Sequence, residues 1–186
     1  MALSTQPSPA LFSVRPASDA DAAALHDLAA ATFPLACPPG TRQEDSDEFV
    51  ATHLSVERMR DYLEDETREL LVAESPDSSL LGYTMLVFAE PTDPDVAAAI
   101  ALRPTAELSK CYVAQAAHGA GVGQALIDAS VASAVVRGAA SVWLGVNQLN
   151  GRANRFYERN GFALAGTKRF LVGVRLEDDF VRERVL

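Results

Sequence analysis

Apolar residues recur with two different periods along the chain, and these periods predict where helices and strands lie. From Asp19 onward, DADAAALHDLAAATF has an acidic start and apolar positions at helical spacing, which predicts a helix that ends before Pro34. Prolines, a glycine and a charge run predict a loop over 34–48, and a second helix is expected at about 49–63. A short first strand over 11–15 precedes them.

The rest of the chain mixes strand-like and helix-like segments. Two strand-like runs lie on either side of the turn signal SPDSS, which is typical of an antiparallel hairpin. A Pro- and Asp-flanked insert follows, with room for a short Ala-rich helix. The expected strands are 69–74, 80–89, 107–113, 141–146, 162–174 and 179–185; the expected helices are one within 91–104, one from HGAGVG to about 137 and one over 150–159.

This order of elements predicts an α/β fold, in which a mixed sheet is flanked by helices. We expect a disordered N-terminal tail over 1–10 and a single domain over 11–186. A chain of 186 residues is long enough to bury a sizeable core in one domain.

The composition is that of a globular protein with an acidic surface. Hydrophobic residues make up 48% and charged residues 22%, and the formal net charge is −9. Such a field repels phosphate backbones, which disfavours a nucleic-acid partner and favours small cationic amines or basic peptides. No apolar run has the length of a membrane span, and the first residues lack the pattern of a secretory signal. We therefore expect a cytoplasmic protein without a membrane partner.

Cysteines and histidines give no sign of a metal site. Cys37 and Cys111 lie far apart, and neither they nor the three histidines have metal-ligand spacing. Two widely separated cysteines fit a reducing compartment better than a disulfide framework. No bound metal is expected.

The most informative segment is KCYVAQAAHGAGVGQALIDA, in which a strand leads through three glycines into a helix. Free N–H groups and the positive end of the helix dipole together form an anion site at such a helix start. Gly119, Gly121 and Gly123 lack the Cβ atom that would block close approach of a phosphate to the backbone. A diphosphate is the expected ligand.

Two other phosphate-binding motifs do not match this segment. A Walker A loop requires Lys and Ser or Thr after its last glycine, and neither follows Gly123. The dinucleotide pattern requires a small residue where this chain has Gln124 or Leu126. The next strand also ends at Asn147 instead of the acidic residue that would bind a ribose.

Two motifs resemble those of the GNAT N-acetyltransferases. His118, Gly121 and Gly123 match the family's [Q/R]xxGxG/A pattern after a strand, with histidine replacing the usual Gln or Arg. Downstream, LNGRANRFYERNGF resembles the family's Asn-x-x-Ala-x-x-x-Tyr segment followed by Gly-Phe. The motifs occur in the family's order, separated by one helix and one strand. Within the family, the chain looks most similar to the bacterial polyamine-type enzymes.

The resemblance implies a splayed central sheet, acetyl-CoA as the acyl donor, and transfer of the acetyl group to a primary amine by direct attack in a ternary complex. Because residues 113–123 contain no Lys or Arg, phosphate binding is expected to depend on main-chain N–H groups, helped by Arg152 or Arg155. The implied coenzyme-binding residues are Cys111, Tyr112, Val113, His118, Gly119, Ala120, Gly121, Val122, Gly123, Gln124 and Asn150.

The same resemblance implies two residues for proton transfer. Tyr157 occupies the position of the general acid that protonates the departing thiolate. The alternative is a core-facing tyrosine, because Ala153 and Tyr157 share one helix face. Glu107 is the candidate base, acting through water on an amine that is mostly protonated at neutral pH. The alternative is an exposed carboxylate at a strand end.

Other features leave a structural explanation open. Asn150 either contacts the coenzyme or caps a helix, whereas Cys111 is expected to be a buried, inert thiol and Trp143 a core residue. The acids within 44–48 and 61–66 either attract a polycation or form a solvated surface. A polyamine or other small cationic amine is the expected acceptor. A protein N-terminus or lysine, an acyl-CoA sensor without turnover, and a homodimer all remain open.

Overall fold

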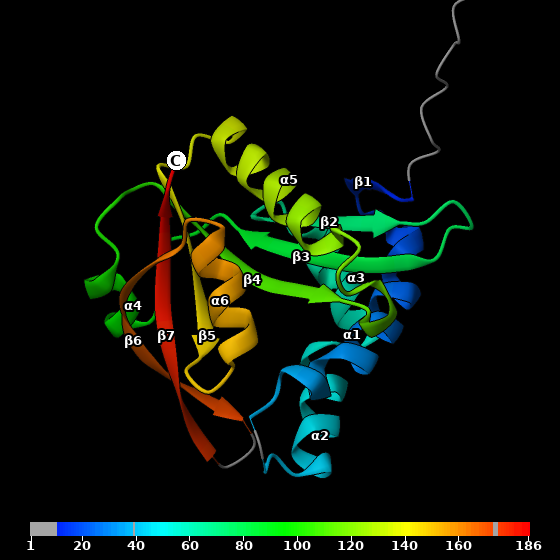
Figure 1. Ribbon diagram of the computed structural model, residues 1–186, viewed down its shortest axis with the longest axis horizontal. Helices are drawn as coiled ribbons and strands as arrows, with labels where there is room; N and C mark the ends of the chain where they lie inside the picture. The colour runs from blue at the N-terminus through cyan, green and yellow to red at the C-terminus, as the bar shows by residue number, and fades with distance from the viewer. Residues whose placement is uncertain (1–10, 39, 173–174) are drawn as a thin grey trace, which may run out of the picture.

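A seven-stranded sheet with the order β1-β2-β3-β4-β5-β7-β6 forms the centre of the protein (Figure 1). The computed structural model describes residues 11–38, 40–172 and 175–186, so the tail expected at 1–10 lies outside the described residues. Neighbouring strands are antiparallel except β4 and β5, which are parallel. The predicted mixed α/β fold is confirmed. The strands are β1 (Ser13–Pro16), β2 (Arg68–Glu74), β3 (Leu80–Val87), β4 (Thr105–Val113), β5 (Ser141–Asn147), β6 (Ala163–Val172) and β7 (Arg175–Val185).

Helices cover both faces of the sheet. In Figure 1, α5 and α6 lie in front of the sheet, and α1 and α3 lie behind β2 to β4. The short Ala-rich helix expected in the insert is present as α4, and it packs against β6. The helices are α1 (Ala22–Ala36), α2 (Gln43–His53), α3 (Val56–Glu64), α4 (Pro94–Ala99), α5 (Val122–Val136) and α6 (Gly151–Arg159), with 3-10 turns at Asp19–Asp21 and Gln115–Ala117. No helix in the described part of the chain has both the length and the apolar character needed to cross a bilayer.

The loop predicted over 34–48 is largely helical, which corrects the sequence interpretation. α1 continues through Pro34, which lacks the N–H for one helical hydrogen bond and lies in the last turn, so that α1 ends two residues later at Ala36. The ring of Phe33 also stacks on that of Phe49, with centroids 4.3 Å apart, and holds this end of α1 against α2. The charge run begins α2 because acids in a first turn complement the helix dipole.

The single helix predicted at about 49–63 corresponds to parts of two helices, the end of α2 and most of α3. Ser55 separates α2 from α3, and its side chain accepts a hydrogen bond from the Arg58 N–H as an N-cap. At the C-terminus, β7 begins at Arg175, four residues before the strand start expected from the sequence.

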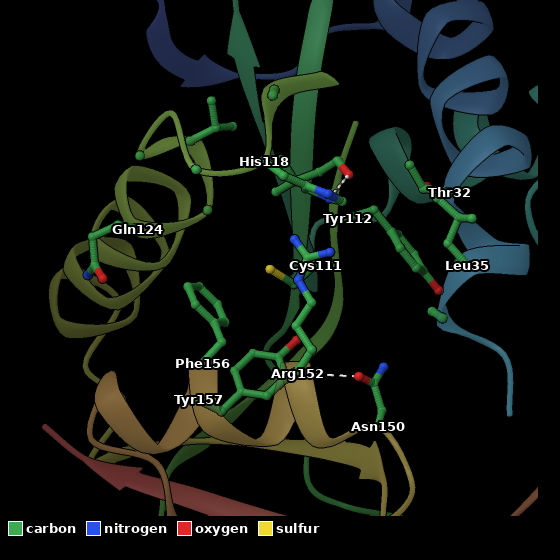
Figure 2. Close-up of a pocket in the computed structure, with 18 of the residues that line it drawn as sticks. Thr32, Leu35, Cys111, Tyr112, His118, Gln124, Asn150, Arg152, Phe156 and Tyr157 are labelled. Carbon is green, nitrogen blue, oxygen red and sulfur yellow. Dashed lines mark hydrogen bonds between the residues drawn. The ribbon is translucent and has the colours of Figure 1, made fainter. Parts of the chain in front are cut away.

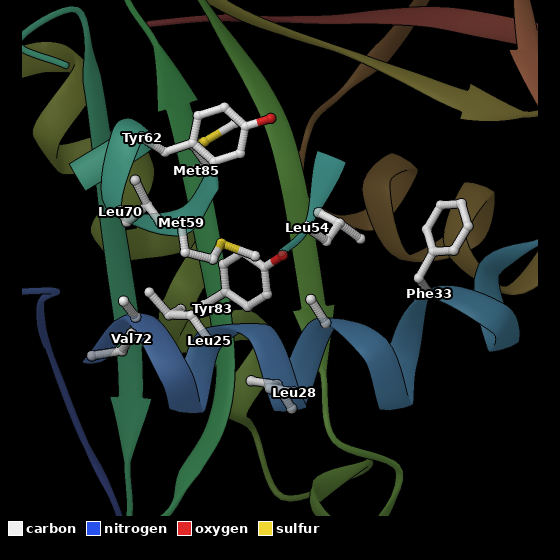
Figure 3. Close-up of a cluster of buried hydrophobic side chains, with 12 residues drawn as sticks. Leu25, Leu28, Phe33, Leu54, Met59, Tyr62, Leu70, Val72, Tyr83 and Met85 are labelled. Atoms are coloured by element: carbon white, nitrogen blue, oxygen red, sulfur yellow. The ribbon is translucent and has the colours of Figure 1, made fainter. Parts of the chain in front are cut away.

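A buried cluster under α1 and α3 fixes the C-terminal end of α1 relative to the sheet. Leu25, Met59, Tyr83 and Met85 are almost completely buried there, and Phe33 lies at the end of the cluster (Figure 3). Burial of such side chains stabilises by about 1.5–3 kcal/mol each. The segment that follows Phe33 is thereby held beside β4.

The pairing between β4 and β5 is short, and the two strands separate beyond it. Only Thr105, Ala106 and Glu107 pair with β5. In the β3–β4 pairing, Met85 faces Lys110 and Leu86 faces Leu108, so Ser109 is an extra residue that forms a β-bulge. Such bulges bend a strand and redirect its side chains. The result is the splayed sheet that the resemblance implied, with an open edge along the second half of β4.

Candidate active site

Two cavities meet at the gap between β4 and β5. The first, here the glycine-loop cavity, has a volume of about 490 Å³ and lies between the end of α1, the end of β4, the first turn of α5 and one side of α6 (Figure 2). The second, the carboxylate cavity, has a volume of about 280 Å³. Both are lined by Ala36, Cys111, Tyr112, Asn150, Ala153 and Tyr157.

The glycine loop presents the N-terminus of α5 to the first cavity. Gly119 and Gly121 both have φ of +83°, a left-handed conformation that favours glycine, and Gly121 is the N-cap of α5. The first intrahelical bond runs from Ala125 N to Gly121 O, so the four N–H groups before Ala125 have no helical partner. Gly123 faces α6, where a Cβ would make an ordinary van der Waals contact of 3.4 Å with Phe156 Cζ.

The free edge of β4 supplies main-chain groups to the same cavity. Ala114 N donates to Leu81 O on the β3 side. Because alternate residues of a strand point their N–H groups to the same edge, those of Cys111 and Val113 point away from β3 into the gap. The carbonyl oxygen of Val113 lies at this edge as well, 3.0 Å from His118 Nε2.

Most residues implied as coenzyme-binding line the glycine-loop cavity; Ala120 is not among its lining residues. The side chain of Gln124 is turned toward Asp128 and Asn160, so Gln124 offers its main chain to the cavity. Of the two arginines considered as phosphate ligands, Arg152 lines the cavity, and Arg155 is not among the lining residues. Arg159, which the sequence analysis did not select, lines it too.

Asn150 is a helix cap that also lies at the two cavities, and its contact with the coenzyme stays a prediction. Its Oδ1 accepts a hydrogen bond from Ala153 N at 3.0 Å, so it caps α6. It also lines both cavities, because the cap lies at the mouth of the gap.

Tyr157 of α6 lies beside Cys111 at the junction of the cavities (Figure 2). Burial raises the pKa of the Tyr157 hydroxyl well above its usual range, and the adjacent Cys111 raises it further, so the hydroxyl keeps its proton. Burial also raises the pKa of the Cys111 thiol to about 11, so hardly any thiolate exists at neutral pH. This agrees with the expectation of an inert thiol at Cys111. Tyr157 packs on the hydrophobic core and at the same time faces both cavities.

The carboxylate cavity has one apolar and one charged side. The stacked rings of Phe33 and Phe49 contribute to the apolar side. The charged side consists of Glu107 and Lys110 on β4, Lys168 on β6, and Glu177 and Asp179 on β7.

Glu107 is not the exposed strand-end carboxylate considered as its alternative. It is partly buried and lines the carboxylate cavity, and burial raises its pKa. Lys110, also in the cavity, has a pKa lowered to about 8 by burial and by the nearby Arg68 and Arg58. Trp143 is buried, as expected for a core residue.

The acids of 44–48 are absent from the described lining of both cavities; they start α2, where Asp45 is buried against Arg42. Two of the three acids that line the carboxylate cavity, Glu177 and Asp179, were missed, whereas the third, Glu107, was selected. The available signal was a strand, RLEDDFVRERV, in which two alternate acids point to one face. Acids on one face of a central strand need an explanation, because charged residues are rarely buried without a partner.

Comparisons with known proteins identify the class. The Acetyltransferase (GNAT) family profile matches residues 23–162, and the chain belongs to this family of N-acetyltransferases. An uncharacterised N-acetyltransferase of Mycobacterium tuberculosis is 43% identical over 166 residues, which cover 89% of this chain and 98% of the relative.

Solved structures share the fold. The PaiA N-acetyltransferase of Thermoplasma acidophilum, crystallised in complex with coenzyme A, has a TM-score of 0.76 at 20% identity and covers 94% of this chain and 99% of its own. The spermidine/spermine N-acetyltransferase SpeG of Vibrio cholerae has a TM-score of 0.63 at 18% identity, over 94% and 92% of the two chains. The GNAT resemblance is confirmed, and the polyamine-type subgroup stays a prediction.

Proposed function

We propose that the protein transfers an acetyl group from acetyl-CoA to a primary amine by direct attack within a ternary complex. The observation that carries this proposal is the meeting of two cavities at Cys111, Tyr112 and Tyr157. A donor in one cavity and an acceptor in the other would come together at the gap between β4 and β5. Holding two reactants in one site lowers the barrier by removing much of the entropy cost of their encounter.

The glycine-loop cavity suits a coenzyme with a diphosphate. The N–H groups that precede Ala125 and the dipole of α5 would hold the diphosphate, with Arg152 and Arg159 nearby to balance charge. The N–H groups of Cys111 and Val113 are available to the pantetheine arm and the thioester carbonyl. Acetyl-CoA supplies the activated acetyl group. The coenzyme A complex of the Thermoplasma relative supports this assignment.

We assign Tyr157 as the proton donor and Glu107 as the proton acceptor of the reaction. A raised pKa keeps Tyr157 protonated and able to donate a proton to the departing thiolate. An aliphatic amine with a pKa near 10.4 is mostly protonated at pH 7, which costs roughly 4–5 kcal/mol before attack. Glu107, whose pKa is raised by burial, would accept that proton through water.

The carboxylate cavity favours a small cationic amine as the acceptor. Its volume of about 280 Å³ admits a small molecule, and three of its charged residues are carboxylates. Spermidine and related amines are the first candidates, and the similarity to SpeG of Vibrio cholerae is in keeping with this. A lysine side chain or the N-terminus of a protein is the second candidate, because either could insert from outside.

The test measures thiol release from acetyl-CoA with four amines: spermidine, 1,4-diaminobutane, 2-phenylethylamine and a lysine-containing peptide. We expect coenzyme A to bind in calorimetry and at least one amine to accelerate thiol release, with the acetylated amine found by mass spectrometry. Coenzyme binding without turnover of any amine would instead indicate an acyl-CoA sensor. Absence of coenzyme binding would overturn the donor assignment.

A further inference from the structure

Asp179 on β7 is a buried carboxylate that the acetyl transfer described above does not use. It is 7% exposed and lines the carboxylate cavity. In the sheet it lies directly opposite Asn147 on β5 and Lys168 on β6. Opposite residues of paired strands share one face, so these three side chains lie on the same side of the sheet.

The neighbours of Asp179 orient its carboxylate. Asn147 Oδ1 accepts a hydrogen bond from Leu149 N at 2.9 Å, which leaves the Asn147 amide N–H₂ group to donate to Asp179. A carboxylate has about four acceptor positions, so the Asn147 amide and the neighbouring Lys168 together still leave room for a further donor. Asn147 therefore helps to fix the orientation of the Asp179 carboxylate.

Gly145 provides the space in which this carboxylate lies. A Cβ at Gly145 would lie 2.7 Å from Lys168 Cε and 3.5 Å from Asp179 Oδ2. The side chains of Lys168 and Asp179 thus extend over bare backbone at the floor of the carboxylate cavity.

The strand register places Asp179 closer to the gap than Glu107. Glu107 is level with Trp143 on β5, whereas Asp179 is level with Asn147, four residues further along the same strand. At about 3.3 Å per residue, this offset is roughly 13 Å. Cys111 lies four residues beyond Glu107 on the parallel strand β4, but the bulge at Ser109 shortens this step to three residues of β3, or roughly 10 Å. Asp179 and Cys111 therefore lie within about one residue of the same level, on opposite sides of the gap.

Charged groups around Asp179 come from three strands. Lys168 faces it from β6, Glu177 and Asp178 are its neighbours on β7, and Glu107 and Lys110 face the same cavity from β4. Burial raises the pKa of Asp179 to about 6, and Lys168 opposes that rise. The carboxylate is ionised at neutral pH and is held in a poorly hydrated position.

We propose that Asp179 binds the reacting ammonium group of the acceptor at the gap, as a specificity-determining residue distinct from Glu107, which lies roughly 13 Å further along the sheet and would receive the proton through a chain of water molecules. This inference rests on the proposed acetyl transfer. A buried carboxylate with unused acceptor positions, level with the transfer point and inside the acceptor cavity, provides the charge and the hydrogen-bond acceptors that a primary ammonium needs.

The experiment compares Asp179→Asn with Asp178→Asn, using the amine of the four-member panel that the wild-type enzyme acetylates fastest. Asp178 is exposed and is not among the residues that line the described cavities, so its variant makes the same change in net charge outside the site. For Asp179→Asn we expect the amine KM to rise at least 10-fold, with kcat within 3-fold and the acetyl-CoA KM within 2-fold of wild type. Asp178→Asn should leave all three within 2-fold.

The pH profile gives a second readout. An ionised Asp179 is needed to bind the ammonium. In wild type, kcat/KM for the amine should therefore increase as the pH rises through about 6, and this increase should be absent in Asp179→Asn. A thermal melt checks that the variant folds. Gly145→Ala, whose added methyl would displace Lys168 and reach Asp179, should also raise the amine KM and serves if Asp179→Asn does not fold.

The outcomes separate this inference from the proposed function. A wild-type enzyme that acetylates none of the four amines overturns both. An active wild type in which Asp179→Asn lowers only the melting temperature, with amine KM and pH profile unchanged, shows a structural partner of the neighbouring strands and overturns the inference alone. A fall in kcat without a change in KM would assign Asp179 to proton transfer and also contradict it.

Discussion

The Nε2 atom of His118 lies 3.0 Å from the main-chain carbonyl oxygen of Val113, and this contact links the glycine loop to the open edge of β4. Both residues line the glycine-loop cavity. The contact is solvent-exposed, where one hydrogen bond contributes about 0.5–1.5 kcal/mol. The histidine that replaces the usual Gln or Arg of the family motif therefore connects the glycine loop to β4 through this contact.

Removing this contact should loosen the coenzyme site without affecting the acceptor side. For His118→Ala we expect the acetyl-CoA KM to rise about 3- to 10-fold, because a loop freed from β4 must be ordered when the coenzyme binds. The kcat should stay within 2-fold. Steady-state kinetics at saturating amine checks this, and His118→Gln, which retains a donor, should recover most of the affinity. An unchanged KM in His118→Ala would show that the contact has no part in binding.

Tyr157→Phe tests the general acid. Loss of the hydroxyl beside Cys111 should lower kcat about 100-fold, since general acids typically contribute 10²–10⁴-fold, and should leave the acetyl-CoA KM within 2-fold. Tyr62→Phe is the matched control, because its hydroxyl donates to the His53 carbonyl and Tyr62 is not among the residues that line the described cavities. Full activity in Tyr157→Phe would remove Tyr157 as the acid.

Alanine substitutions at two left-handed glycines can distinguish the cost of backbone strain from an effect on coenzyme binding. Gly121 and Gly138 have φ of +83° and +79°, and nothing lies within 4 Å of a Cβ added at either position. Alanine should therefore cost about 1–2 kcal/mol of stability at both, from the left-handed conformation alone. Only Gly121→Ala should also raise the acetyl-CoA KM, because Gly121 is the N-cap of α5 at the cavity. Urea denaturation and kinetics on both variants test this; an equal rise in KM for Gly138→Ala would contradict it.

The ion pair of Arg15 with Asp21 predicts a pH dependence of folding stability. Hydrogen bonds from Arg15 lower the pKa of Asp21 from 3.8 to about 2. A depressed carboxylate pKa stabilises the folded state above about pH 4, and this contribution disappears as the pH falls toward 2. We expect Asp21→Asn to lose about 1–2 kcal/mol at pH 7 after allowance for solvent screening, and little at pH 2. Asp19→Asn, at an exposed pair with Arg60, should cost less than about 0.5 kcal/mol. Urea denaturation at both pH values provides the measurement; a pH-independent loss for Asp21→Asn would contradict the assignment.

Local sequence signals determined the elements that carry the coenzyme motif. The left-handed backbone at 119 and 121 is readily adopted by glycine, and the helix after them has apolar positions at helical spacing, so the loop and the start of α5 follow from residues close in sequence. A helix cap was one of the two roles considered for Asn150 on local grounds, and Asn150 does cap α6. These are short-range effects of backbone geometry, and the sequence alone contains them.

The acceptor side depended on long-range contacts. α1 continues past Pro34, and the rings of Phe33 and Phe49 stack, which no local pattern indicates. The carboxylates of the cavity come from β4 and β7, strands that are far apart in sequence and that the sheet places on either side of β5. The bulge at Ser109 opens the edge of β4. The sequence by itself determined the family motifs and most elements; the tertiary structure decided which buried charges share a cavity, because pairing of distant strands places them there.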